Sequence, residues 1–154
     1  MKNIIIRQAV ESDIDALAEI VKKYRDFQGV ALQDRQEIKA FLCARIKNSE
    51  SVILIALHEP STTILGFVQL YPVFSTVSLK RQWLLNDFFV DEEARNSGIG
   101  SLLMEAVKTY FRGRGKGFIL ITEKTNTGAK RFYAKHGWQT DHFDFYCYFY
   151  DTDA

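Results

Sequence analysis

The sequence predicts a single α/β domain over residues 1–154, in which a mixed, mostly antiparallel sheet of six to seven strands carries helices on both faces. Two observations predict this class. Apolar β-rich runs alternate with segments whose apolar residues recur at helical spacing. The chain of 154 residues has about the length of one domain, and no Ser-, Gly- or Pro-rich tract indicates a linker.

The first third of the chain predicts a strand followed by two helices. Residues 3–8 are a β-rich run, after which Ser12 and Asp13 can cap a helix that ends near Gly29. Its apolar residues follow the helical period; they are Ile14, Leu17, Ile20, Val21 and Tyr24. A second amphipathic segment, residues 34–47, predicts another helix.

The rest of the chain predicts the sheet and two further helices. Residues 51–57 and 63–70 form a predicted hairpin, and residues 83–90 a further strand. A helix over about 98–111 follows and ends before a glycine-containing loop. The remaining elements, in order, are a short buried strand at 118–122, a helix at 126–136 and a closing aromatic strand or hairpin at 143–150.

Composition excludes several classes of protein. The net charge of +1 provides no general attraction for nucleic acid or an anionic membrane. No apolar run approaches the roughly 18 residues of a membrane span, and no signal peptide is evident. Cys43 and Cys147 match no disulfide framework or metal-ligand spacing, so we expect two thiols in a reducing compartment, a cytoplasmic location and no metal.

The most informative segment is a strand, turn and helix that contains Arg95, Gly98 and Gly100. Glycines at a helix start leave unpaired backbone N–H groups open to an anion, and an arginine adds a bidentate contact, so a pyrophosphate fits this chemistry. A Walker A string is absent, and Leu103 replaces the third glycine of a dinucleotide fingerprint. A plain glycine-containing helix start is the remaining alternative.

Two motifs in register resemble a known family. Arg95 to Gly100 has the spacing R-x-x-G-x-G, and residues 126–138 follow N-x-x-A-x-x-F-Y-x-x-x-G-W. Both patterns are similar to those of the GCN5-related N-acetyltransferases (GNAT superfamily). The resemblance covers residues 3–150 in element order, is strongest over 85–138, and implies the GNAT-like acyltransferase fold with acetyl-CoA as co-substrate.

The resemblance also implies roles for individual residues. Backbone groups of Phe89 and Val90 would bind the pantetheine arm, and Tyr133 would lie near the sulfur and protonate it. Asn126 shares a helix face with Tyr133 and would line the same cofactor groove, although Tyr133 could instead be an ordinary core residue. The diphosphate would be held by Arg95, Asn96, Ser97, Gly98, Ile99, Gly100 and Ser101.

The general base is less clear from the sequence. Residues 85–90 resemble the polyamine N-acetyltransferase branch, in which a Glu is common where Asn86 stands. Asp87 is the candidate base, but neighbouring strand residues point to opposite faces unless a bulge intervenes. A buried structural carboxylate at Asp87, a base at Glu92 and an ordered water that relays the proton are the alternatives.

The acceptor is expected to be a small primary amine or polyamine with a hydrophobic stem. Most of the candidate residues are aromatic and a few have polar tips: Tyr24, Phe27, Tyr71, Phe74 and Trp83, with Asp26 beside them in the sequence. A peptide or protein amine is the alternative acceptor, and a non-catalytic acyl-CoA-binding module is the alternative function. The family implies a homodimer, and the basic loop at 112–116 is interpreted as a solvated turn.

Overall fold

The computed structural model describes residues 3–150, and the chain divides into two compact units. The first unit ends at Ile121 and the second begins at Thr122. In the described residues, no helix is long and apolar enough to cross a membrane. The same residues contain no group of His, Cys, Asp and Glu side chains that could hold a metal ion.

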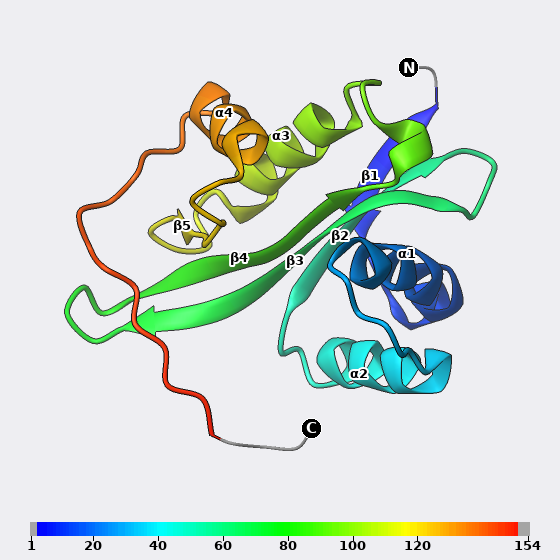
Figure 1. Ribbon diagram of the computed structural model, residues 1–154, viewed down its shortest axis with the longest axis horizontal. Helices are drawn as coiled ribbons and strands as arrows, with labels where there is room; N and C mark the ends of the chain where they lie inside the picture. The colour runs from blue at the N-terminus through cyan, green and yellow to red at the C-terminus, as the bar shows by residue number, and fades with distance from the viewer. Residues whose placement is uncertain (1–2, 151–154) are drawn as a thin grey trace. The chain divides into compact units, whose positions relative to one another are not determined.

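The first unit is built on a twisted sheet with the strand order β1-β2-β3-β4-β5 (Figure 1). Neighbouring strands from β1 to β4 run antiparallel, and β5 pairs in parallel with β4. The strands are β1 (Ile4–Gln8), β2 (Val52–His58), β3 (Ile64–Ser75), β4 (Lys80–Val90) and β5 (Phe118–Ile119). The mixed, mostly antiparallel character predicted from the sequence is therefore confirmed.

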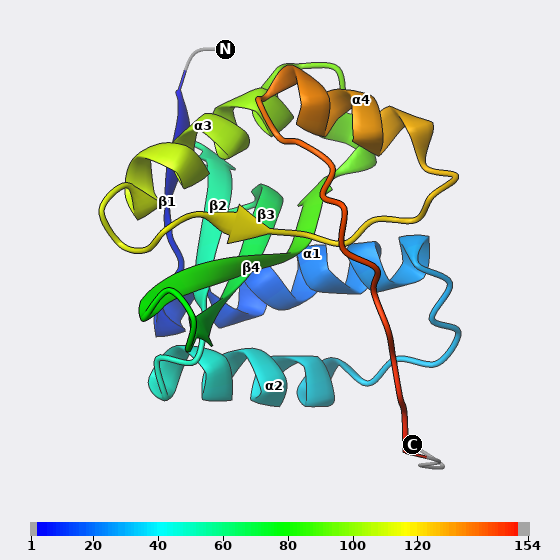
Figure 2. The same ribbon diagram turned by 90° about the vertical axis from the view of Figure 1, so that its left-hand side faces the viewer.

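Helices cover both faces of this sheet, as predicted (Figure 2). Helices α1 (Ile14–Phe27) and α2 (Arg35–Lys47) lie on one face, and α3 (Ile99–Phe111) lies on the other. Alternate residues of β2 point to the face that α1 and α2 cover. These residues are Ile53, Ile55 and Leu57, and they form a buried cluster with Leu17, Ile20 and Ile38. The side chain of Asp34 begins α2 by accepting a hydrogen bond from the amide of Gln36.

The hairpin of β3 and β4 contains an irregularity that positions the site. Gln69 lies opposite Asp87, whereas the next residue, Leu70, lies opposite Leu85. Asn86 therefore has no cross-strand partner, which is the signature of a β-bulge on β4. Towards their turn the two strands continue past the start of β2, as far as the pair of Ser75 and Lys80.

The second unit contains α4 (Thr127–Lys135). The side chain of Asn126 begins this helix by accepting a hydrogen bond of 3.1 Å from the amide of Ala129. Residues 143–150 have no regular secondary structure, and the aromatic side chains among them are exposed.

The predicted strand count and several predicted strand bounds were wrong. The described residues form five strands rather than six to seven, because residues 143–150 form no strand. The strand predicted at 118–122 contains only Phe118 and Ile119, and the strands predicted at 63–70 and 83–90 extend over Ile64–Ser75 and Lys80–Val90. The alternation of aromatic residues favours a strand, but a strand also needs a hydrogen-bonded neighbour. No neighbouring strand pairs with residues 143–150 in the described part of the chain.

Candidate functional site

The turn between β4 and α3 has the geometry that its glycines predict. Gly98 caps α3 in the left-handed region, with φ of 85°, and its carbonyl accepts the amide of Leu102 at 3.1 Å. Among residues 3–150, no side chain caps the start of this helix. The amides of Ile99 and Gly100 belong to the first turn, where no acceptor exists within the helix, so they are suited to bind an anion.

Arg95 lies beside this turn in a fixed position. Its Nε donates to the carbonyl of Val90 at 3.1 Å, and its guanidinium lies 5.1 Å from the ring centre of Phe27 and 5.4 Å from that of Phe89. Within residues 3–150, no acidic side chain pairs with the guanidinium, so its terminal nitrogens can contact an anion. The Ser97 hydroxyl donates to the carbonyl of Ala94. This hydrogen bond stabilises the turn.

Asp91 ties the start of the turn to α1. Its buried carboxylate accepts a hydrogen bond of 2.6 Å from Lys23 and another of 3.3 Å from the amide of Glu93, which begins the short 3₁₀ helix Glu92–Ala94. Burial favours a raised pKa for Asp91, but the hydrogen bonds from Lys23 and Glu93 and the charges of Lys23 and Arg95 together lower this pKa. Asp91 is therefore a structural carboxylate.

The bulge on β4 places Asn86 and Asp87 at one cavity. Strand alternation predicts opposite faces for these neighbours, yet both side chains line the same cavity, and Asn86 Nδ2 donates to Asp87 Oδ2 at 2.9 Å. The extra residue of the bulge removes the alternation at this point. The bulge that Asp87 needs in order to share a face with Asn86 is therefore present.

The surroundings of Asp87 favour its neutral form. Burial raises the pKa of the Asp87 carboxyl above its usual range, and hydrogen bonds with Asn86 and Tyr24 offset this only in part. Burial and the nearby charge of Asp87 also raise the pKa of the Tyr71 hydroxyl. A raised pKa makes the Asp87 carboxylate a stronger base than usual, so it is suited to accept a proton from a ligand in the cavity.

The cavity next to Asp87 is bounded by α1, α2, β3 and β4, and we call it the Asp87 cavity. Its volume is about 350 Å³. Apolar side chains form most of its wall, and its polar groups converge near Asp87. The lining residues are Val21, Tyr24, Arg25, Glu37, Ile38, Phe41, Leu42, Phe67, Gln69, Tyr71, Asn86 and Asp87.

Gln69 contributes an unusual group to the Asp87 cavity. Its side chain is only 3% exposed, and its Oε1 has no hydrogen-bond partner in the described structure. A buried carbonyl oxygen without a donor is destabilising unless a ligand supplies one. Gln69 and Asp87, directly opposite each other, therefore offer two acceptors to an N–H group.

The predicted acceptor residues separate into two sets. Tyr24 and Tyr71 line the Asp87 cavity, whereas Phe27, Phe74 and Trp83 do not. Phe27 and Phe74 are 65% and 68% exposed and lie under the guanidiniums of Arg95 and Arg81, respectively. Trp83 is buried and donates through Nε1 to the carbonyl of Arg114 at 3.0 Å.

Sequence reasoning missed Gln69 and Glu37, which both line the Asp87 cavity. Gln69 had a signal, because it is a lone amide within the apolar run 64–70. Glu37 gave no signal in the sequence, because acidic residues are common in the first turn of a helix, where they interact favourably with the helix dipole.

The second unit carries Asn126 and Tyr133. The Asn126 side chain is engaged at the start of α4, and the Tyr133 ring lies 5.7 Å from the ring centre of Trp138. Burial raises the pKa of the Tyr133 hydroxyl, so it is protonated near neutral pH and can donate a proton.

Comparisons with known proteins point to one family. Residues 15–138 match the acetyltransferase (GNAT) family. The uncharacterised N-acetyltransferase YhfO of Bacillus subtilis is 46% identical over 137 residues, which are 88% of this chain and 90% of that protein. A crystal structure of a "probable acetyltransferase" has a TM-score of 0.90 and 36% identity, and the match covers 97% of this chain and 99% of that one.

A more distant structure shares the fold. The predicted acetyltransferase of Clostridium acetobutylicum, solved with acetyl-CoA, has a TM-score of 0.75 and 18% identity. The match covers 94% of this chain and 96% of that one.

Proposed function

Because the chain belongs to the acetyltransferase (GNAT) family, we propose that it transfers the acetyl group of acetyl-CoA to a small primary amine or polyamine. The proposed transfer is direct, within a ternary complex. The observation that carries the acceptor assignment is the pair of Asp87 and Gln69. A carboxylate and an unpartnered amide oxygen line one mostly apolar cavity, and together they can accept hydrogen bonds from an amine.

The residues present fit the co-substrate. The N-terminal amides of α3, the left-handed Gly98 and the guanidinium of Arg95 form a site for a diphosphate. When bound, acetyl-CoA supplies an acyl thioester for the amine to attack. The family supports this choice of co-substrate, and so does a structure of the same fold that was solved with acetyl-CoA.

We assign the proton transfers to two residues. Asp87 accepts a proton from the amine, and its raised pKa makes its carboxylate a stronger base than that of an ordinary aspartate. Gln69 Oε1 holds a second N–H and so orients the nitrogen lone pair. Tyr133 donates a proton to the departing thiolate, a role supported by its place in the N-x-x-A-x-x-F-Y motif and by a hydroxyl that is protonated near neutral pH.

The experiment that tests this function measures thiol release from acetyl-CoA with a panel of acceptors. The panel contains a monoamine with an alkyl stem, a polyamine, a lysine peptide and a peptide with a free N-terminus. Turnover that is fastest with a small amine and is lost in Asp87→Asn supports the proposal. Faster turnover of either peptide overturns the acceptor class, and acetyl-CoA binding without thiol release overturns the enzyme.

We also propose that the chain forms a homodimer. The family resemblance supports this, and so does the exposure of six aromatic side chains at 143–150, since large exposed apolar groups in one segment are typical of interfaces. The mass in solution, measured by light scattering, is expected to be twice that of the chain. A monomeric mass would contradict the proposal.

A further inference from the structure

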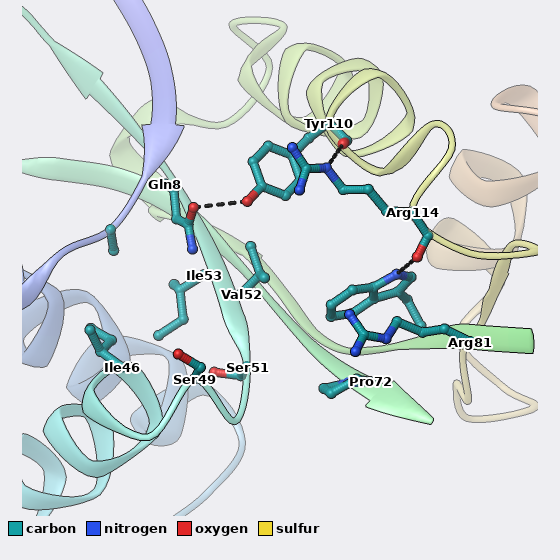
Figure 3. Close-up of a pocket in the computed structure, with 12 residues that line it drawn as sticks. Gln8, Ile46, Ser49, Ser51, Val52, Ile53, Pro72, Arg81, Tyr110 and Arg114 are labelled. Atoms are coloured by element: carbon teal, nitrogen blue, oxygen red, sulfur yellow. Dashed lines mark hydrogen bonds between the residues drawn. The ribbon is translucent and has the colours of Figure 1, made fainter. Parts of the chain in front are cut away.

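A second cavity in the first unit lies at the other end of β4 from the glycine turn (Figure 3). Its volume is about 380 Å³, and it is found where β1 ends, β2 begins and α3 ends. Arg81 of this cavity and Asp87 are on the same strand, and the six residue steps from one to the other span roughly 20 Å of extended chain. The two cavities have no lining residue in common.

Two arginines give this second cavity a positive charge. Arg81 and Arg114 both line it, and its wall contains no aspartate or glutamate. Over residues 3–150, neither guanidinium forms an ion pair with a carboxylate. Arginine is suited to bind a carboxylate or phosphate through two parallel hydrogen bonds. Two arginines that line a cavity without an ion pair to a carboxylate therefore indicate a site for an anion.

Both guanidiniums are held in place without an anion. Arg114 Nε donates to the carbonyl of Tyr110 at 2.7 Å, and the guanidinium lies 4.4 Å from the ring centre of Tyr110. The Arg81 guanidinium lies 5.4 Å from the ring centre of Trp83. Trp83 in turn donates to the carbonyl of Arg114, which fixes the loop that carries this residue. Little side-chain freedom is therefore lost when an anion binds.

Ser51 is the independent observation that points to a ligand. It lines the same cavity, is 8% exposed, and its Oγ is buried with no hydrogen-bond partner. A hydroxyl in this position costs free energy unless it bonds to something in the cavity. Figure 3 shows Ser51, Arg81 and Arg114 on different parts of the cavity wall, so a ligand that fills the cavity can contact all three.

The rest of the wall limits the ligand. Ile46, Ile53 and Pro72 present apolar surface, and the Tyr110 hydroxyl donates to Gln8 Oε1 at 2.9 Å, which leaves the phenol oxygen as an acceptor. A ligand with both a charged head and an apolar part fits this wall better than an inorganic ion does.

We propose that this second cavity, which we name the Arg81–Arg114 cavity, binds a small organic anion with a carboxylate or phosphate head group. The charged head binds the guanidiniums that line the cavity, Ser51 Oγ donates to an acceptor oxygen of the ligand, and the apolar part lies against Ile46, Ile53 and Pro72. The basic loop at 112–116 is thus part of a binding site and not only a solvated turn. This inference is independent of the acetyltransferase activity.

The test is calorimetric titration of the full chain with two probes, phenyl phosphate and benzoate, which distinguish the two head groups. We expect saturable binding of at least one probe, with a Kd of about 1 mM or lower. Arg81→Gln, Arg114→Gln and Ser51→Ala are each expected to weaken binding about tenfold, since each removes a hydrogen bond to a charged group. Circular dichroism checks that each variant folds. Arg81→Lys serves as a second variant at position 81, because it keeps the positive charge but loses the two parallel N–H donors of the guanidinium.

Lys116→Gln is the matched control, because Lys116 belongs to the same basic loop but does not line the cavity. Binding in this variant is expected to stay within about twofold of the unmodified protein, as for a screened surface charge. Absence of saturable binding of both probes, or equal losses in Lys116→Gln and Arg114→Gln, would overturn the site. Displacement of the probe by coenzyme A would also overturn it, because the anion would then belong to the co-substrate.

Discussion

Gln69 and Asp87 face each other directly across β3 and β4, and both side chains line one cavity. The pair exists because the bulge at Asn86 shifts the register immediately after it. Gln69 has a buried oxygen without a donor, and Asp87 has a carboxyl group whose pKa is raised by burial. Each group is costly in the free protein, and each is relieved by an amine that supplies N–H donors.

Replacing Asp87 with asparagine is expected to lower kcat by about 10²-fold, the size of one general acid–base contribution. The pH dependence of kcat shows in which direction the protonation of Asp87 acts. Burial raises the pKa of Asp87, so activity falls as pH drops through this raised pKa, and the acidic limb lies above the usual carboxyl range of about 4. In Asp87→Asn this limb disappears. A variant profile that keeps the same limb would assign the base to water or to Glu92.

Asp87→Asn should increase the stability of the fold at pH 8, although it lowers kcat. The folded pKa of Asp87 exceeds its unfolded value, so the folded state loses stability as pH rises through the interval between them. Asp87→Asn removes this loss, and its melting temperature should exceed that of the unmodified protein at pH 8 but not at pH 3. Asp15→Asn, at an exposed carboxylate paired with Lys39, is the control and should show no such gain.

Replacing Gln69 with leucine tests the amide oxygen alone. We expect the KM for the amine to rise about tenfold, since a hydrogen bond to a charged group is lost. Stability should stay equal or increase, because a buried oxygen without a partner is replaced by an apolar group of similar size. Gln82→Leu makes the same change on β4 outside the Asp87 cavity and should leave KM unaltered. An unchanged KM in Gln69→Leu would remove Gln69 from the acceptor site.

Local features of the site were predictable from the sequence. The strand, turn and helix around Gly98 follow from residues that are adjacent in the chain, so their spacing alone defines the turn. The bulge at Asn86 was not predictable, because it depends on the pairing of β4 with β3 rather than on either strand by itself. The role of Arg114 was also hidden, since it requires the loop after α3 to lie against Arg81 and Trp83.

Gly98→Ala tests the diphosphate site. A side chain at φ of 85° costs about 1 kcal/mol of stability, and we expect the affinity for acetyl-CoA to fall at least about tenfold. Gly29→Ala is a matched control, because Gly29 has the same φ of 85° and its added Cβ would meet no atom within 4 Å. It should lose the same stability yet bind acetyl-CoA normally. Equal affinities in the two variants would show that the turn does not hold the co-substrate.

Replacing Tyr133 with phenylalanine separates catalysis from binding. The hydroxyl is protonated near neutral pH because burial raises its pKa, so its loss should lower kcat by about 10²-fold. The ring remains against Trp138, so acetyl-CoA affinity should change less than twofold, on the order of 0.4 kcal/mol.

A series of acyl donors makes the Tyr133 experiment specific. If Tyr133 protonates the thiolate, an acyl donor with a more acidic thiol should need it less, and the difference in kcat between Tyr133→Phe and the unmodified protein should shrink with such a donor. Tyr146→Phe, at a tyrosine that is 87% exposed, is the control and should match the unmodified protein with every donor. If the kcat of Tyr133→Phe is normal with acetyl-CoA, the proton comes from another group and Tyr133 serves packing alone.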